Sequence, residues 1–275
     1  MTLWHRLGLA AVFSLLFAVT PAAARNATPP ETAPTPQSAA PAPTPVPVPS
    51  SVSTPVPTPS ATAVVYGTTA TAPPGPEADR VGVLSSGGHH FCTASVIDSP
   101  GGTLALTAAH CLDTPEGVTF TPAYRNGTAP YGTWTVTAVH TTDAWQDSED
   151  PDADFALLEI APDPATGRTV QSVLGGTPVD FAAPLTATAR LYGYPARTET
   201  PILCTNTTTA QSPTQRRIDC PSYPGGTSGG PFVDTTTGHL IGIIGGHQQG
   251  GDTEDTSYSP ALGAALRTLY EDVTT

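Results

Sequence analysis

An abrupt change in composition near Ala63 most constrains what this chain of 275 residues can fold into. The segment Arg25–Ala63 consists almost wholly of Pro, Ala, Thr, Ser and Val and carries almost no charge. Such a composition cannot bury a core and favours extended polyproline II conformation. We therefore expect residues 25–63 to be a disordered linker. Residues 64–275 are then one folded domain, long enough for a well-buried core.

The start of the chain has the features of a secretory signal peptide. The short, weakly positive segment Met1–Arg6 precedes the uncharged apolar run Leu7–Thr20, and small residues follow at Ala22–Ala24. The run is shorter than the ~20 apolar residues of a membrane-spanning helix. We therefore expect residues 1–24 to be cleaved as a signal peptide, with secretion and no stable membrane insertion. An uncleaved anchor is the alternative. The linker could be a propeptide, or a tether that holds the protein at a cell wall or surface.

The net charge of −13 argues against nucleic acid as a partner, because nucleic acids select basic surfaces. Acidic residues concentrate in Asp147–Asp163 and Asp252–Asp255. Solubility outside the cell explains them simply. An acidic patch beside a substrate groove would instead favour basic peptides.

The four cysteines suit an oxidising compartment and allow three pairings. We expect Cys92–Cys111 and Cys204–Cys220, because each closes a short loop worth about 3 kcal/mol in the chain-entropy model. A zinc site is the alternative, with candidate ligands His89, His90, Cys92, His110 and Cys111. Their spacing matches no usual zinc pattern, so we expect no metal and no other cofactor.

The folded part is predicted to consist of short strands separated by turns rich in Pro, Gly, Asn and Asp. Strands are expected at residues 81–84, 92–97, 103–107, 132–140, 155–160, 186–192 and 240–244. One C-terminal helix is expected, capped by Ser259, with Pro260 in its first turn. Leu262, Leu266 and Leu269 would share one face of that helix. The pattern predicts an all-β barrel or sandwich.

The glycine-rich turn Gly225–Pro231 carries the strongest chemical signal. Its serine, Ser228, is a poor nucleophile until a neighbouring base takes the hydroxyl proton. The N–H groups of Gly226 and Ser228 can point at one spot and form an oxyanion hole. Glycines permit the backbone torsions that such a turn needs. An incidental serine in a glycine-rich turn is the alternative.

A histidine and an aspartate supply the other members of a triad. His110 follows an apolar strand within Thr107–Cys111 and is the predicted general base. Asp154 begins a second apolar strand, where an acid needs a partner, and is expected to orient His110. Asp152 is its competitor, because it faces the same side of an extended chain. The order His, Asp, Ser is one of the known triad orders.

These motifs resemble the trypsin-like (chymotrypsin-fold) serine peptidases, and in particular their secreted bacterial members. The resemblance extends from Val81 to Tyr270 and rests on the segments 91–97, 107–111, 154–158, 226–231 and 240–243. It implies two antiparallel six-stranded β-barrels with the triad in the cleft between them. His110 and Asp154 would belong to the first barrel and Ser228 to the second. The two expected disulfides match bridges that the family uses.

The function implied is a secreted serine endopeptidase that cleaves protein or peptide substrates as a monomer. A catalytically silent, peptidase-like binding protein at the cell surface is the alternative. The resemblance also implies pocket walls at Pro221–Gly226 and Gly245–His247. Ser222 stands where trypsin has an aspartate, which weakens a preference for basic residues. His247 could meet an acidic side chain, and Gly245–Gly246 could offer a backbone edge to a peptide.

One departure from the family concerns activation. In the animal enzymes the residue before the nucleophile is an aspartate that pairs with a newly cut N-terminus, whereas this chain has Thr227 there. We therefore expect activity without a defined new N-terminus. Chains that begin at different points between residues 60 and 80 should be similarly active.

Overall fold

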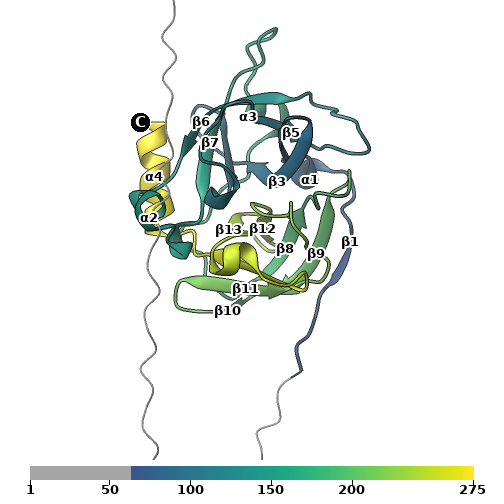
Figure 1. Ribbon diagram of the computed structural model, residues 1–275, viewed down its shortest axis with the longest axis vertical. Helices are drawn as coiled ribbons and strands as arrows, with labels where there is room; N and C mark the ends of the chain where they lie inside the picture. Colours follow the sequence, from purple (N-terminus) through teal and green to yellow (C-terminus); the bar gives the residue numbers. More distant parts are fainter. Residues whose placement is uncertain (1–62) are drawn as a thin grey trace, which may run out of the picture. The chain divides into compact units, whose positions relative to one another are not determined.

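The computed structural model describes residues 63–275 (Figure 1). The predicted signal peptide, and all but the last residue of the predicted linker, lie outside the described residues. Strands are the commonest regular structure of the described chain, and its α-helices are α1 (Pro76–Asp79), α2 (Asp143–Ser148), α3 (Val170–Leu174) and α4 (Ala264–Thr274). None of the helices in residues 63–275 has the length and apolar character that crossing a membrane requires.

The first half is a closed barrel of six antiparallel strands in the order β2-β3-β4-β7-β6-β5. The strands are β2 (Val81–Ser86), β3 (His89–Val96), β4 (Leu104–Thr107), β5 (Thr119–Pro122), β6 (Trp134–His140) and β7 (Ala156–Ile160). Alternation along β6 shows why the chain folds this way. Trp134 and Val136 are buried and Thr135 and Thr137 are exposed, as the period of two in a strand requires. The predicted first barrel is confirmed.

The second half contains two sheets. One has five strands in the order β1-β9-β8-β12-β13, and the other has three in the order β10-β11-β14. Their strands are β1 (Thr68–Thr71), β8 (Thr188–Gly193), β9 (Ile202–Thr207), β10 (Thr209–Ala210), β11 (Gln215–Asp219), β12 (Pro231–Asp234), β13 (Leu240–Ile243) and β14 (Thr256–Pro260).

Side chains bridge these two sheets at both junctions. At one junction the Asn206 amide donates to the Asp219 carbonyl oxygen at 2.7 Å. At the other, the Ser259 hydroxyl oxygen accepts the Ile243 N–H at 3.0 Å. The second half therefore resembles a barrel, but continuous strand pairing does not close it. The expectation of two six-stranded barrels is confirmed for the first half and only partly met in the second.

The C-terminal helix is present, but its predicted start is wrong. Ser259 and Pro260 end β14, and α4 begins at Ala264 after Gly263. The Ser259 hydroxyl is occupied by its bond to β13, so a tertiary contact replaces the expected cap. Leu266 of α4 is buried, and the helix packs on the core cluster that contains Leu104 and Phe155.

Candidate active site

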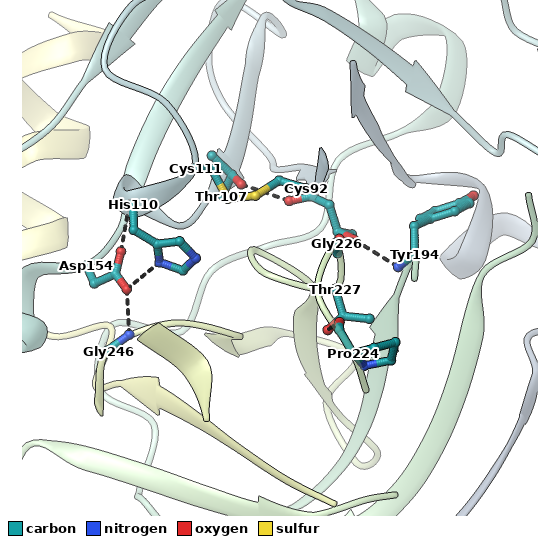
Figure 2. The surroundings of a disulfide bond; sticks show 11 residues. Cys92, Thr107, His110, Cys111, Asp154, Tyr194, Pro224, Gly226, Thr227 and Gly246 are labelled. Atoms are coloured by element: carbon teal, nitrogen blue, oxygen red, sulfur yellow. Dashed lines mark hydrogen bonds and ion pairs between the residues drawn. A yellow bond between two sulfur atoms is a disulfide. The ribbon is translucent and has the colours of Figure 1, made fainter. Parts of the chain in front are cut away.

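His110 and Asp154 form a closely paired unit (Figure 2). His110 lies in a short 3₁₀ turn after β4, and Asp154 lies between the turn Pro151–Ala153 and β7. The ring Nδ1 of His110 is 2.8 Å from Oδ2 of Asp154, and the His110 backbone N–H donates to Oδ1 at 2.9 Å. With a carboxylate at Nδ1, the ring proton is held there, and Nε2 is left able to accept a proton.

The carboxylate of Asp154 is 0% exposed and has a third donor, the N–H of Gly246 at 2.7 Å (Figure 2). A buried carboxylate without donors would be costly, and these three hydrogen bonds satisfy its oxygens and fix its orientation. The competitor Asp152 is exposed, and its Oδ1 instead accepts the side-chain amide of Gln215 at 2.6 Å. The structure thus brings Asp154, and not Asp152, to His110.

Both expected disulfides are formed. Cys92 is bonded to Cys111 and Cys204 to Cys220. Cys92, Cys111 and His110 lie close enough together to hold a metal ion. Cysteine binds zinc as a thiolate, however, and the disulfide removes both thiolates. The bridge instead attaches the turn that carries His110 to strand β3.

Three N–H groups of the glycine-rich turn, those of Gly225, Gly226 and Ser228, donate to no acceptor among residues 63–275. Within the described chain, the N–H groups of Thr227, Gly229 and Gly230 all donate to carbonyl oxygens, whereas those of Gly226 and Ser228 have no acceptor. These two are the predicted oxyanion-hole donors. These two N–H groups are free to bind an oxyanion because contacts of the turn's carbonyl groups orient them.

Carbonyl contacts of the turn set the direction of those N–H groups. The carbonyl oxygen of Gly225 accepts the Ala196 N–H at 2.9 Å, and that of Thr227 accepts the Gly230 N–H at 2.9 Å. In a trans peptide the C=O and N–H point in opposite directions, so the N–H groups of Gly226 and Ser228 face away from these partners. Gly226 has φ 96°, and a Cβ there would collide with Ala196. Only glycine fits.

The turn also lies against the segment that leads to His110. The Ser228 carbonyl oxygen accepts the Thr93 N–H at 2.8 Å. A Cβ on Gly229 would be 3.1 Å from the backbone nitrogen of Ala108, so the two chain segments touch. No hydrogen bond joins the side chains of His110 and Ser228 among residues 63–275, and in unliganded sites this bond is often long and tightens when substrate binds.

The predicted substrate-groove residues differ in their environments. Ser222 is exposed, with φ 69°. His247 is half-buried, and its ring meets Tyr258 edge-on, with centroids 4.7 Å apart. A Cβ on Gly245 would be 3.0 Å from Oδ2 of Asp154, so this glycine allows the backbone to approach the carboxylate.

The expectation for Gly246 needs correction. Its N–H donates to Asp154 and its carbonyl oxygen accepts the Gln249 N–H at 2.8 Å, so neither group is free to pair with a peptide. Gly245 donates its N–H to Tyr258, while its carbonyl oxygen has no donor within the described residues. Of the backbone groups of Gly245 and Gly246, the Gly245 carbonyl oxygen is therefore the one left without a partner among the described residues.

Two buried residues near the site were missed by the sequence reasoning. Gln215 is 4% exposed, and its amide oxygen accepts the His247 N–H while its amide nitrogen donates to the Pro151 carbonyl and to Asp152. It links the pocket wall to the turn before Asp154. Thr93 contacts the glycine-rich turn. Only its place beside Cys92 could have signalled it.

Comparison with known proteins agrees with this geometry. The family model for the trypsin-like peptidase domain matches residues 92–243, so the chain belongs to the trypsin-like peptidase family. The crystal structure of protease Anisep from Arthrobacter nicotinovorans is 25% identical, with a TM-score of 0.64, and covers 75% of this chain and 99% of that one. No curated protein matches.

Two further solved structures have the same fold. The thermostable serine protease AL20 from an extremophilic microorganism is 25% identical, with a TM-score of 0.63, and covers 73% of this chain and 99% of that one. A Glu endopeptidase, 16% identical, reaches a TM-score of 0.63 over 76% of this chain and 97% of that one. At that identity the likeness concerns the fold alone.

Proposed function

We propose that the chain is a secreted serine endopeptidase with Ser228 as nucleophile, His110 as general base and Asp154 as the group that orients it. The observation that carries the proposal is the hydrogen-bonded pair of His110 and the buried Asp154, which lies close to a turn with unengaged N–H groups on Gly226 and Ser228. Membership of the trypsin-like peptidase family supports peptide-bond hydrolysis as the reaction.

The proposed reaction has two halves. Ser228 Oγ attacks the substrate carbonyl carbon while its proton passes to Nε2 of His110. The resulting oxyanion is stabilised by the N–H groups of Gly226 and Ser228, each worth about 3 kcal/mol in such sites. The C–N bond breaks, and the amine leaves with the proton from His110. Water then attacks the acyl-enzyme with His110 again as base, which releases the acid and restores Ser228.

Secretion is proposed from the signal-peptide pattern and the two disulfides, which persist in oxidising compartments. Protein or peptide is the proposed substrate, bound with a backbone hydrogen bond to the Gly245 carbonyl. The chemistry proposed for these residues uses no metal or organic cofactor, and the enzyme is proposed to act as a monomer.

Fluorophosphonate labelling of the secreted protein tests the proposal. We expect covalent labelling at Ser228, together with hydrolysis of a peptide library whose products define the pocket. Ser228→Ala should abolish both, and His110→Ala should lower kcat by about 10³-fold or more. Ser86→Ala is the matched control, because Ser86 is an exposed serine at the end of β2, and this variant should be labelled as the parent is. A folded parent protein that is neither labelled nor active would favour the silent binding protein.

Activity should also fall in acid, because a protonated imidazole cannot accept the serine proton. The measurement is kcat/KM of the parent between about pH 5 and about pH 9, where histidine bases change their charge. A rate that stays level across this range would contradict a histidine base.

A further inference from the structure

Thr93 of β3 faces the second half of the fold. Its neighbours Cys92 and Ala94 belong to the core of the first barrel, and side chains alternate along a strand, so Thr93 points the other way. Its side chain is 0% exposed. The hydroxyl donates to the Gly226 carbonyl oxygen at 2.9 Å and accepts the Tyr194 N–H at 2.9 Å.

The main chain of Thr93 holds the same turn. Its N–H donates to the Ser228 carbonyl oxygen at 2.8 Å, and its own carbonyl oxygen accepts the Thr107 hydroxyl at 2.8 Å. Thr93 therefore provides one hydrogen bond to Gly226 and one to Ser228. These are the two residues whose N–H groups form the proposed oxyanion hole.

We propose that Thr93 is a positioning residue for the oxyanion hole and that its hydroxyl fixes the turn in the orientation that presents the Gly226 N–H to the substrate. This inference rests on the proposed function. The hydroxyl is the sole donor to the Gly226 carbonyl oxygen among the described residues. Without it, the Gly226–Thr227 peptide is held only by the Thr227 N–H, which donates to the Pro224 carbonyl oxygen at 3.3 Å. A shift of this peptide moves the adjoining Gly225–Gly226 peptide, which carries the Gly226 N–H.

The direction of the hydroxyl proton is set by Tyr194. Because its N–H occupies a lone pair of the Thr93 oxygen, the hydroxyl proton is left for Gly226, and the two bonds in series strengthen each other. Ala196, two residues after Tyr194, donates to Gly225. One short segment thus supports the peptides on both sides of Gly226.

The strand that carries Thr93 also mounts the proposed base. Cys92 precedes Thr93 and is bonded to Cys111, which follows His110. The oxyanion turn and His110 are consequently fixed to adjacent residues of β3. A positioning residue here would set the distance between the base and the nucleophile as well as the direction of the N–H groups.

Thr93→Val, measured in the secreted protein, tests the inference, because valine keeps the shape and removes the hydroxyl. We expect kcat to fall about 10- to 100-fold with KM within about twofold, since the oxyanion interaction is made in the transition state. The rate of fluorophosphonate labelling should fall in parallel. Thr93→Ser should restore kcat to within about threefold of the parent, because it keeps the hydroxyl.

Ser95→Ala is the matched control. Ser95 is 1% exposed and lies two residues along β3 on the same face, and its hydroxyl has no partner among the described residues. It should leave kcat unchanged. If Thr93→Val does not fold, Thr93→Cys replaces it. A thiol is a weak donor, so kcat of the cysteine variant should be well below that of Thr93→Ser.

The results separate the inference from the proposed function. A folded parent without labelling or hydrolysis overturns the proposed function. An active parent with an unchanged kcat in folded Thr93→Val, or in Thr93→Cys if that variant is needed, overturns the inference. So does an equal loss in Ser95→Ala, or a change confined to KM.

Discussion

Thr227, the residue before the proposed nucleophile, is held by hydrogen bonds between uncharged groups. It is buried, its hydroxyl donates to the Pro224 carbonyl oxygen at 2.7 Å, and its N–H donates to the same oxygen at 3.3 Å. Gly193 packs against its methyl group, with no room for a Cβ. The turn therefore needs no ammonium partner at this position.

Arg216 of β11 is the largest fully buried side chain of the described chain. Its Nε, Nη1 and Nη2 have no hydrogen-bond partner among residues 63–275. Burial lowers the pKa of its guanidinium to about 10, against the opposing attraction of Asp180 and Asp234. An uncompensated charge in a protein interior costs several kcal/mol.

Arg216→Met should therefore stabilise the protein by about 1–2 kcal/mol, because a flexible apolar side chain fills much of the same space without a charge. Urea unfolding of the parent and the variant measures the difference. Arg217→Met is the control. Arg217 is partly exposed and paired with Asp219 at 2.7 Å, so its loss should not stabilise. A destabilised Arg216→Met would mean that the charge is compensated in solution.

Prediction from the sequence worked for residues whose signal is local. His110, Asp154 and the cysteine pairs stand in short motifs, and the structure brings each to its expected partner. Thr93 and Gln215 were missed, because their hydrogen-bond partners are 133 and 63 positions away along the chain. A buried threonine or glutamine is recognised only when the second half of the fold is in place.

At the scale of elements, β1 joins two distant parts of the chain. It precedes the first barrel, yet it pairs with β9 of the second half. The Gly67 N–H donates to the Asp219 carbonyl at 2.9 Å, and the Thr69 hydroxyl donates to the Pro221 carbonyl oxygen at 2.5 Å, where the predicted pocket wall begins. Farther along, Glu77 of α1 forms a two-point ion pair with Arg190 of β8, at 2.6 and 2.7 Å.

These contacts narrow the expectation that any start between residues 60 and 80 is equivalent. A chain that begins at Ala63 keeps β1 and should match the full secreted protein in kcat/KM and Tm. A chain that begins at Pro73 loses β1, and we expect its Tm to fall by about 4–8 °C, which corresponds to roughly 2 kcal/mol. Its KM should rise as the pocket wall loosens.

Thermal unfolding and peptide kinetics on the two chains measure these effects. Glu77→Gln in the longer chain tests the ion pair with Arg190 separately from β1. It should lower the free energy of unfolding by about 1 kcal/mol, because the paired charge is lost. Equal Tm and KM for the two chain starts would contradict a role for β1.

Some strands could be predicted from the sequence pattern and others could not. Apolar strands such as β4, β7 and β13 were predicted because long buried side chains mark them. Strands rich in threonine or arginine, such as β9 and β11, were missed, since their pairing and not their composition makes them strands. The start of α4 was misplaced because Ser259 has a partner in β13.

At the scale of the whole molecule, the two disulfides have different structural roles. Cys92–Cys111 lies beside His110 and Thr93 in the site, whereas Cys204–Cys220 joins β9 to the end of β11, within the second half. They close loops of similar length, with sequence separations of 19 and 16. The chain-entropy model therefore gives both about 3 kcal/mol of stability.

Replacing each pair by alanine should separate stability from activity. Both double variants should lose about 3 kcal/mol in the free energy of unfolding. Well below Tm, Cys204→Ala/Cys220→Ala should keep its kcat, and Cys92→Ala/Cys111→Ala should lose most of it, because the mounting of His110 is gone. Unfolding curves and single-temperature kinetics provide both numbers, and equal kcat values for the two variants would contradict the assignment.

The uncharged anchoring of Thr227 has a consequence for control of the enzyme. The turn has no buried ion pair with a newly cut N-terminus to form. We therefore expect it to become ordered during folding, without a proteolytic cleavage that activates it. Control that does not depend on a newly cut N-terminus would instead act through the place of release, through a propeptide, or through an inhibitor that occupies the groove. A cell that makes such a protein would protect itself through timing of export and separation from its own proteins.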